Sequence, residues 1–545
     1  MLNVTLLFYV ALFGGLFWLV HRVRQLGRPP KGLPPGPPTK PILGNLHQLS
    51  LETGHKQMLK WAEEYGPMYT LMLGPNEPAI VLSEERQIRD LLVKRGTNFS
   101  SRPDHYMAHD VLSGGLRVIF MVSTCSSCPA FYIPKGSHIL AEDVVRKTYL
   151  SYQYLEGKAL LLGLLEKPED FMTHLQRFSL SFSTQITYGF RTPTHDHPLV
   201  KKIVYHFEEF SKVSATPTAH ILNIFPLLRR LPDFCLPGRK RGWELHQQEK
   251  KLFVDLYQDV ETQMRAGTTE PCATVMFIEV QKKEQEQVSP ELMAYYSGSL
   301  LQAAMETTLA TITGFVQAMV IFPEVAKTAQ AEIDRVCGDR MPRIEDWNDL
   351  KYIRGCIKES LRWMPTTILG VPHSADEEEL YAGYRIPKKT TIIYNVWALH
   401  NDPKRYPDPR RFDPGRWAND DSTSYESATN EEVGKRDHFG FGFGRRMCLA
   451  MNLVDQNLFL VMSRLLWAFD FNRAIDDKTG LEIVPDKENL QFGLFVMPAP
   501  FPANIAPRTA DKARQIRAEW NQAAEEFLDE NLQWKGMPPD MPRVV

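Results

Sequence analysis

The segment that most limits how this chain can fold is Phe441–Ala450, with the sequence FGFGRRMCLA. Its two glycines permit a tight turn and let the backbone approach a flat ligand closely. Cys448 follows them and leads into the apolar stretch Leu449–Phe471, for which we predict a long helix. A thiol at a helix N-terminus ionises more readily, because the dipole and the free N–H groups there favour negative charge. We expect this loop to present Cys448 as a thiolate, while Arg446 strengthens that effect or neutralises an anionic cofactor.

Composition excludes one class of partner. The 545 residues carry a formal net charge of −2, from 63 basic and 65 acidic side chains. A chain so balanced lacks the excess of positive charge that is typical of proteins that bind nucleic acid. The 7 cysteines are few for this length and odd in number. They argue against a disulfide framework and favour a reducing compartment.

The N-terminus predicts a membrane anchor. Residues 1–20 contain no charged side chain and are dominated by Leu, Phe, Val and Ala. About 20 helical residues reach roughly 30 Å, the thickness of the hydrocarbon core. Four cations follow, and the positive-inside bias would keep the rest of the chain in the cytosol; they are Arg22, Arg24, Arg28 and Lys31. We predict a single-pass transmembrane helix at residues 1–21, and the alternative is a buried N-terminal core helix.

Three further regions follow the predicted anchor. A proline-rich run between Pro29 and Pro38 cannot form helix or sheet, so residues 22–45 are predicted to be a basic, semi-rigid linker. Residues 46–507 are expected to form one large domain. Residues 508–545 are expected to form a helical tail, with a charged helix at Ala510–Leu532.

Hydrophobic patterning within the large domain predicts mostly helix. Gly54–Tyr65 is a helical segment, and Met68–Leu73 and Ala79–Leu82 are strands around a Gly-Pro turn. Residues 140–365 are mostly helical, and short strands return at 380–400. Because the strands do not alternate with the helices, we predict a mainly α architecture with minor β, an α+β fold.

A second constellation lies in Ser289–Phe322, a long helical candidate that opens with a Ser-Pro pair. Ala303 and Ala304 give this helix a thin wall over which a ligand could lie. Glu306 and Thr307 place an acid beside a hydroxyl in an otherwise apolar run. From the residues alone two interpretations stay open. One is a catalytic pair, and the other is a polar helix face with a threonine bonded to its own helix.

The cysteine segment resembles the haem-binding signature of the cytochrome P-450 family at Phe441, Gly444, Arg446 and Cys448. The resemblance implies haem b (iron protoporphyrin IX) as cofactor, with Cys448 as the proximal iron ligand and Arg446 paired with a haem propionate. Ala450 stands where glycine is usual in the family.

The resemblance assigns roles to the other constellations as well. It implies that Glu306 and Thr307 deliver protons during oxygen activation, with Ala304 in place of the usual glycine. His373 matches a position that often binds a propionate. Glu359 and Arg362, which by themselves would suggest a solvated i, i+3 ion pair, become a structural cluster with Arg416 from the segment Pro409–Trp417.

The resemblance breaks at Val122–Asp143. The family expects here a helix whose tryptophan and arginines cover the haem, but this chain has no tryptophan between Trp61 and Trp243. The segment is instead a loop-like stretch with Ser, Cys and Pro, including a lone C-x-x-C at Cys125–Cys128. We hypothesise a retained intron or a gene-model error, which an unchanged spliced transcript would refute. If the segment is genuine, propionate contacts are missing and haem binding is weakened.

Together these features predict a microsomal, fungal-type monooxygenase in the endoplasmic reticulum membrane, with its catalytic domain in the cytosol. It would act on a lipophilic small molecule of secondary metabolism. Because the chain has no flavin or nicotinamide fingerprint, electrons must come from a separate NADPH-cytochrome reductase. Two alternatives stay open: a haem-thiolate isomerase or dehydratase, and an inactive member that holds no haem.

Overall fold

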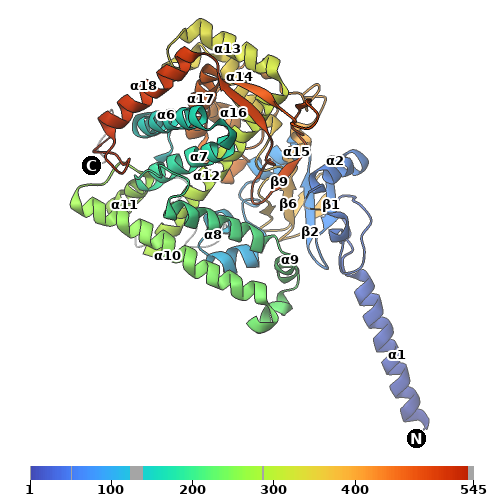
Figure 1. The fold of residues 1–545 in the computed structure, drawn as a ribbon. Coiled ribbons are helices and arrows are strands. Elements are labelled where there is room, and N and C mark those ends of the chain that lie inside the picture. Colours follow the sequence, from blue (N-terminus) through green and yellow to red (C-terminus); the bar gives the residue numbers. More distant parts are fainter. Residues whose placement is uncertain (1, 51, 123–138, 285–287, 538–545) are drawn as a thin grey trace.

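The computed structural model describes residues 2–50, 52–122, 139–284 and 288–537, with the side chains of the first helix described from residue 8 onward. Figure 1 shows a large helical part, a smaller strand-rich part beside it, and helix α1 (Leu2–Gln25) projecting from the strand-rich part. The mainly helical architecture with minor β is therefore confirmed.

Helices make up most of the described chain. The shorter helices are α2 (Gly54–Tyr65), α3 (Glu85–Ile88), α5 (Glu142–Val144), α9 (Pro217–Ile224), α15 (Val396–His400) and α16 (Ser424–Thr429). The longer ones build the helical part: α6 (Leu150–Glu166), α7 (Phe171–Tyr188), α8 (Pro198–Ser214), α10 (Pro237–Ala266), α11 (Ala273–Glu284), α12 (Pro290–Ile321), α13 (Pro323–Cys337), α14 (Lys351–Trp363), α17 (Met451–Ala468) and α18 (Ala510–Phe527).

Strands form one four-stranded sheet and three smaller pairings. The larger sheet has the order β1-β2-β6-β3, with β2 and β6 parallel and the other pairs antiparallel. Its strands are β1 (Met68–Met72), β2 (Pro78–Leu82), β3 (His373–Ser374) and β6 (Thr391–Tyr394). The smaller sheets contain β4 (Glu379–Tyr381), β5 (Tyr384–Ile386), β7 (Phe469–Ile475), β8 (Glu482–Ile483), β9 (Leu490–Phe492), β10 (Val496–Pro498) and β11 (Ala503–Pro507). The pairing of His373 with Ile392 fixes where β3 presents that histidine.

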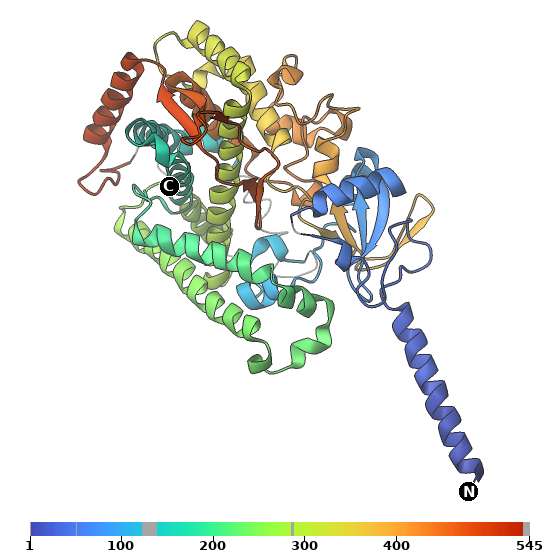
Figure 2. The ribbon, with the colours of Figure 1, turned by 45° about the vertical axis from the view of Figure 1, so that its right-hand side comes forward.

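Helix α12 is the central element of the helical part. The hydroxyl of Ser289 accepts the N–H of Leu292 at 3.2 Å, and Pro290 takes the first helical position, where its missing N–H is not needed. Pro323 follows the helix end and opens α13. Figures 1 and 2 show α12 inside the helical part, with α6, α7 and α10 around it. Among the residues that the structure fully describes, which leave out the side chains of residues 1–7 in α1, α12 is the one helix long and apolar enough to cross a membrane, but 72% of its apolar window is buried, so it is a core helix.

The proline-rich segment does not hang free of the body. The N–H of Thr70 in β1 donates to the carbonyl of Pro35 at 2.8 Å. A Cβ on Gly36 would overlap the carbonyl of Thr70, so only glycine allows this approach. The side chain of Asn45 accepts the N–H of Met72 at 2.8 Å. Residues 35–45 are thus tied to β1 by backbone contacts.

Helix α1 exposes its apolar side chains. Phe8 is 65% exposed, Phe17 75% and Trp18 59%, and Figure 1 shows the helix clear of the body. The transmembrane role of α1 stays a prediction, which we take up below.

The C-terminal region packs against the helical part. Ala523 and Leu528 form a small hydrophobic cluster with Leu155 of α6. Beyond the helix, Trp534 donates its indole N–H to Gln185 of α7 at 2.8 Å. The expected helix Ala510–Leu532 ends earlier, at Phe527.

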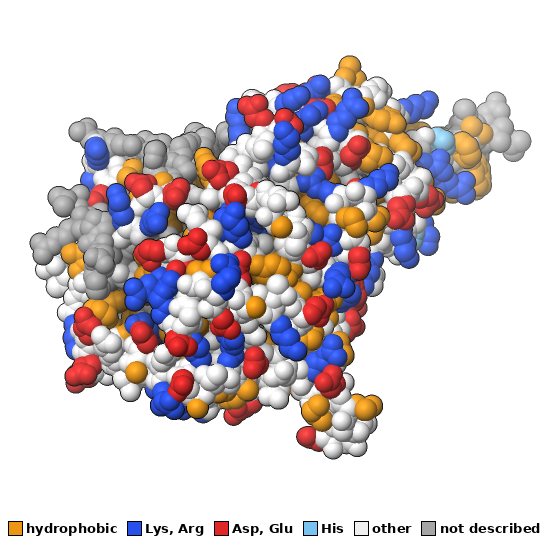
Figure 3. Space-filling view, turned by 90° about the horizontal axis from the view of Figure 1, so that it is seen from above, with side chains coloured by type: hydrophobic (Ala, Val, Ile, Leu, Met, Phe, Trp, Pro, Cys, Tyr) orange, Lys and Arg blue, Asp and Glu red, His pale blue; other side chains and the backbone are white. Residues whose placement is uncertain are grey.

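The surface carries no single-sign field on the face seen from above. Figure 3 shows Lys and Arg interspersed with Asp and Glu across that face. This distribution agrees with the balanced composition of the chain.

Three predicted helix ends were wrong: the end of the C-terminal helix given above and both ends of the helix after Cys448. The helix after Cys448 starts at Met451 rather than Leu449, because Ala450 (φ −94°, ψ 18°) is a non-helical cap. It ends at Ala468, since Phe469–Ile475 leaves the helix to pair as β7 with β11. The predicted helices at Gly54–Tyr65 and Ser289–Phe322 and the two strands around the Gly-Pro turn are confirmed within one residue at most ends.

Candidate active site

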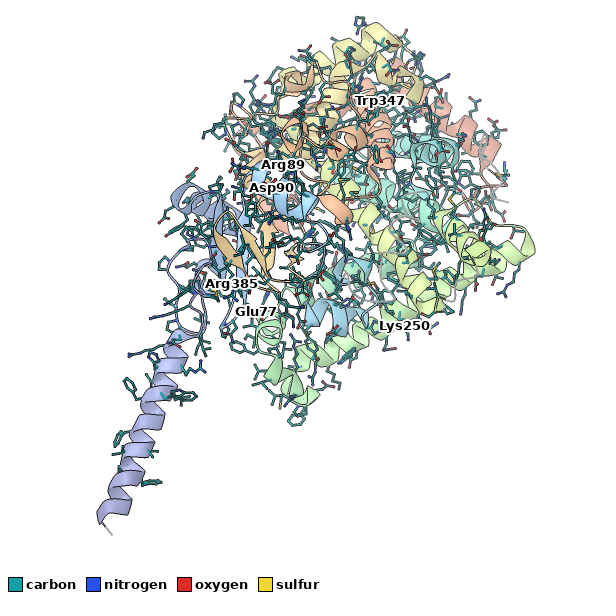
Figure 4. The ribbon with its side chains drawn as sticks, turned by 180° about the vertical axis from the view of Figure 1, so that it is seen from behind. Glu77, Arg89, Asp90, Lys250, Trp347 and Arg385 are labelled. Atoms are coloured by element: carbon teal, nitrogen blue, oxygen red, sulfur yellow. The ribbon has the colours of Figure 1, made fainter. Side chains whose placement is uncertain are left out.

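The cysteine loop is shaped by two glycines with positive φ. Gly442 has φ +77° and Gly444 has φ +61°, a backbone region that other residues adopt at a cost. A Cβ on Gly444 would also overlap the carbonyl oxygen of Leu92. Leu92 belongs to the helical turn Arg89–Lys94, whose Arg89 and Asp90 are labelled in Figure 4. Gly444 is therefore required for the turn and for its close packing.

Cys448 lies at the end of this loop, and the residue as a whole is partly exposed. Its N–H donates to the carbonyl of Phe441 at 2.9 Å, which closes the loop on itself. Burial raises the pKa of Cys448, and a backbone hydrogen bond at Ala450 opposes this only in part. The expected lowering by a helix N-terminus is wrong for the protein alone, because α17 starts at Met451 and burial dominates. A bound metal ion would deprotonate the thiol outright.

Three basic side chains gather beside the cysteine loop: Arg102, His373 and Arg446. Arg446 donates to the carbonyls of Ser100 (3.0 Å) and Met121 (2.6 Å). Burial lowers the pKa of Arg102 to about 10, and the guanidinium of Arg446 pushes it in the same direction. Two like charges held this close favour an anionic ligand between them.

Arg102 is held entirely by main-chain acceptors. It donates to the carbonyls of Ile119 at 3.0 Å and of Val371 and Pro372 at 2.8 Å each. Within the described ranges it forms no ion pair with a carboxylate, although it is only 7% exposed. A buried guanidinium without a counter-charge is expensive, so its orientation toward an anionic group is the simplest account.

His373 is buried and neutral. Burial lowers its pKa to about 3, and the positive charges of Arg102 and Arg446 act in the same direction. Its Nδ1 lies 2.5 Å from the carbonyl of Phe99, and because a carbonyl only accepts, Nδ1 carries the proton. His373 therefore adds a fixed imidazole, rather than a third cation, to the group.

The middle of α12 opens toward the same region. Ala303 is exposed and Ala304, Glu306 and Thr307 are partly exposed, in a helix that is otherwise mostly buried. Ala304 packs against the same hydrophobic cluster as Leu449 and Ala450, which follow Cys448. The structure thus brings this helix face and the cysteine loop to one cluster.

The hydroxyl of Thr307 donates to the carbonyl of Ala303 at 2.7 Å, the back-bonded geometry that was one of the two interpretations. Its oxygen keeps lone pairs with which it can accept a hydrogen bond. Burial raises the pKa of Glu306 to about 7, and the charge of Glu208 on α8 adds to the rise. An acid that titrates near neutral pH beside a hydroxyl can take up and release protons.

Glu359 is the centre of a buried ionic cluster. Both Glu359 and Arg362 are fully buried, and the guanidinium binds the carboxylate bidentately at 2.8 and 2.7 Å. The Nε of Arg416 lies 3.4 Å from the same carboxylate. Two further donors complete its shell: the N–H of Asp413 at 2.9 Å and the indole of Trp417 at 3.2 Å. The sequence prediction brought these three charged residues together, and the structure places them in contact.

A buried histidine connects this cluster to the cysteine loop. Arg362 donates to the carbonyl of His400 at 2.8 Å, and Nδ1 of His400 lies 2.8 Å from the carbonyl of Arg362. The N–H of Phe439 donates to Nε2 of His400, also at 2.8 Å. Burial holds the pKa of His400 well below its usual range, so the ring stays neutral with one donor and one acceptor. A continuous set of contacts therefore runs from Glu359 to the start of the loop.

Sequence reasoning missed Arg102 and His400. Neither belongs to a recognisable motif, since Arg102 follows two serines and His400 ends a short helix. Their roles arise from contacts with segments remote in sequence. Arg102, for example, contacts residues that lie 17 to 270 positions away along the chain. The anomalous segment Val122–Asp143 lies mostly outside the described residues, because 123–138 are not described.

These features suit a protein that holds an anionic group beside a single cysteine. The family model for cytochrome P450 matches residues 34–124 and 163–498. The chain is 47% identical over 526 residues to the cytochrome P450 monooxygenase virE of Hypocrea virens, covering 96% of this chain and 94% of that protein. It is 46% identical to fogE of Aspergillus ruber (97% and 96%) and 41% identical to fsoB of Humicola fuscoatra (97% of each), both cytochrome P450 monooxygenases.

The chain belongs to the cytochrome P450 family, and it is a monooxygenase of that family. Membership implies haem, and the residues fit that group: a single thiol on a glycine-shaped loop and buried cations for its carboxylates. The family match is interrupted at 125–162, an interval that contains most of the anomalous segment.

We predict that Glu359→Ala strongly destabilises the protein. Removing the carboxylate leaves Arg362 buried without its counter-charge, which typically costs about 3–5 kcal/mol. Urea unfolding of the full-length, haem-loaded protein would measure the loss. Asp255→Asn is the control, because its ion pair with Lys251 is exposed and worth less than about 1 kcal/mol. Equal losses in the two variants would contradict the structural role of the cluster.

Proposed function

We propose that this enzyme uses haem b to insert one oxygen atom from O2 into a lipophilic small molecule of secondary metabolism. The observation that carries the proposal is the convergence of Arg102, His373 and Arg446 beside the loop of Cys448. The fungal relatives that bear the name monooxygenase support the reaction class.

Cys448 would be the proximal ligand of the haem iron. Phe441 would close the loop through its carbonyl, and Gly444 would allow the backbone to pack beneath the ligand. Arg446 and His373, together with Arg102, would hold the haem propionates. When bound, haem supplies the oxygen-activating chemistry, and thiolate ligation favours O–O cleavage. The protein's own part is to hold, orient and shield the cofactor.

Glu306 and Thr307 would manage protons at the open face of α12. With its pKa near 7, Glu306 is a mixture of protonated and ionised forms at cytosolic pH. The hydroxyl of Thr307 would accept a hydrogen bond at its oxygen while it donates to the carbonyl of Ala303, and it would pass its own proton on only after turning away from that carbonyl.

The cluster of Glu359, Arg362 and Arg416 would position the cysteine loop without touching the cofactor. Its contact chain through His400 ends at Phe439, within the stretch that precedes Gly442. We assign these residues a positioning role.

A lipophilic substrate is supported by apolar side chains that meet near the open face of α12. Phe120, Phe210 and Leu245 form one buried cluster, against which Ile119 and Leu494 pack. Phe495 in the turn between β9 and β10 stacks on Phe207 of α8, with ring centroids 6.4 Å apart. The charged residues nearby are paired with each other, since Arg117 forms an ion pair with Glu249 of α10 at 2.7 Å. An apolar molecule fits such surroundings better than a charged one.

Electrons would come from a separate NADPH-cytochrome reductase, because the sequence contains no flavin or nicotinamide fingerprint. The enzyme would be anchored in the endoplasmic reticulum membrane by α1, with the catalytic part in the cytosol. Support comes from the exposed apolar side chains of α1 and from further ones after α9, where Leu227 is 75% exposed and Phe234 84%. Figure 1 shows the end of α9 and α1 at the lower side of the molecule.

The two alternatives have less support. A haem-thiolate isomerase or dehydratase would not need the acid–hydroxyl pair of Glu306 and Thr307, and the relatives above are named monooxygenases. An inactive member without haem would have no use for uncompensated Arg102 beside Arg446. Dependence of turnover on O2 and NADPH separates the first alternative from the proposal.

Substitution of the proposed ligand is the direct test of the cofactor assignment. Cys448→Ser should abolish the thiolate-type Soret band of the reduced carbon monoxide complex, because serine cannot supply a thiolate. Cys235→Ser, at an exposed cysteine, should leave the band unchanged. A thiolate-type band that survives in Cys448→Ser would refute Cys448 as the ligand.

The pH profile tests Glu306. Below pH 7 the side chain is protonated and can donate; above it the carboxylate predominates, so product formed per NADPH consumed should fall as pH rises from 6 through about 7. Glu306→Gln should lose this pH dependence, and its turnover rate should fall roughly 10-fold or more. The measurement uses a substrate found by a spectral binding screen. Glu291→Gln, exposed in the first turn of α12, is the control. An unchanged limb in Glu306→Gln would rule the residue out as the titrating group.

The anchor is tested by deletion of residues 2–25. The truncated protein should leave the microsomal membrane fraction and no longer float with lipid vesicles, because the apolar helix supplies most of the partition energy. Neutralising Arg22 and Arg24 to Gln keeps that helix and should keep the protein with the vesicles. Flotation of the truncated chain at the level of the intact one would contradict the anchor.

A further inference from the structure

A buried arginine ties residues 113–121 to three helices of the helical part. Arg117 is 3% exposed, and one nitrogen of its guanidinium donates to both carboxylate oxygens of Glu249 on α10, at 2.8 and 2.7 Å. A second nitrogen donates to the side-chain oxygen of Gln302 on α12. The guanidinium carbon lies 4.0 Å from the ring centroid of Phe210 on α8, a cation–π contact. Figures 1 and 2 show this light-blue part of the chain beside α8 and α10. We refer to Arg117, Glu249 and Gln302 as the loop–helix triad.

The triad is satisfied by other side chains of the protein. The amide nitrogen of Gln302 donates to Glu249 at 3.0 Å, and the hydroxyl of Tyr295 donates to the same carboxylate at 3.3 Å. Because this hydroxyl donates to the carboxylate, its oxygen accepts from Nδ1 of His246, which lies 2.8 Å away. Burial lowers the pKa of His246, so the ring stays neutral. A buried polar network whose members are all paired holds its neighbours in one arrangement. The triad therefore needs no ligand and acts on the position of the chain.

The same segment is held a second time, beside the cysteine loop. The carbonyl of Ile119 accepts from Arg102 at 3.0 Å, and the carbonyl of Met121 accepts from Arg446 at 2.6 Å. Phe120 lies between these two points and belongs to the apolar cluster near the open face of α12. Residues 113–121 are thus fixed by the triad at one end and by the two cations proposed to hold the propionates at the other.

The triad also lies close to the reacting groups of the proposed function. Gln302 and Glu306 are four residues apart on α12, so they share one face of that helix. Leu116 and Val118, on either side of the arginine, pack against the cluster that contains Met305. Residues 113–121 therefore form a side wall next to the open face of α12.

Resting on the proposed function, we propose that Arg117 is a positioning residue that sets which apolar body the enzyme accepts. Through Glu249 and Gln302 it holds residues 113–121, with Phe120, as a wall of fixed shape beside the open face of α12. A ligand that reaches this wall then binds without having to order it, and ordering side chains on binding costs affinity. Loss of the triad weakens the binding of ligands that reach the wall and spares ligands that do not.

The test uses the full-length, haem-loaded protein and the double variant Arg117→Met/Glu249→Gln. This variant removes both charges together, so neither is left buried without its partner. The probes are imidazole, which is too small to reach the wall, and 1-phenylimidazole, whose ring extends toward it; the shift of the Soret band measures the binding of each. The dissociation constant of imidazole should stay that of the parent. The constant of 1-phenylimidazole should rise roughly 10-fold, the equivalent of ordering one or two side chains.

A second readout does not depend on the haem. Amide hydrogen exchange in the peptide that covers residues 113–121 should be faster in the double variant, because the segment has lost one of its two attachments. If the double variant does not fold, Arg117→Lys decides: lysine keeps the charge but cannot bind Glu249 and Gln302 through one planar fork, so it should show the same change to a smaller extent.

The matched control is Arg508→Met/Asp334→Asn, which removes an ion pair of 2.6 Å between α13 and the end of β11. It should keep the parent's ratio of the two dissociation constants, even where the thermal midpoint falls. The inference is overturned if this ratio is unchanged in the triad variant, if it changes equally in the control, or if hydrogen exchange at 113–121 is unaltered. Absence of the thiolate-type Soret band from the parent would instead overturn the proposed function, a result that the exchange measurement does not share.

Discussion

The position of the cysteine loop depends on the fully buried ion pair of Glu359 and Arg362. Two charges removed from water are stable only if every donor and acceptor around them is satisfied. Here the carboxylate accepts from Arg362, Asp413 and Trp417, and the guanidinium donates onward to His400. Satisfying this pair therefore fixes the chain around residues 400–417 and, through His400, the start of the cysteine loop.

Buried cations in this structure fall into two kinds. Arg362 has its counter-charge within the chain, so its role is complete without any ligand. Arg102 and Arg464 are held by main-chain carbonyls and have no carboxylate among the described residues. Burial lowers the pKa of each of the latter two to about 10, a sign of the cost of holding an uncompensated charge. In the proposed function this contrast separates Arg362, which stabilises the fold, from Arg102, which would hold a haem propionate.

The sequence predicted those parts of the site that a local pattern encodes. The cysteine loop, the acid–hydroxyl pair on α12 and the helical surroundings follow from spacing over about ten residues, so their elements were placed correctly. Arg102 and His400 could not be predicted, because each acts through contacts with segments remote in sequence. The start of α17 was misplaced for a related reason: Ala450 is compatible with helix, and only its loop context sets its non-helical backbone.

If Cys448 holds the haem as proposed, the fixation of the cysteine loop has a consequence for electron transfer. Phe439 is tied to His400, Gly444 is packed on Leu92, and the N–H of Cys448 is bonded to Phe441, so the backbone around the sulfur is held at three places. Such outer contacts orient a metal ligand and resist its displacement. A sulfur held in this way shifts little when the charge of the centre changes. Under that proposal the reorganisation energy for accepting an electron from a docked partner would be low, and reduction would not require a rearrangement of the fold.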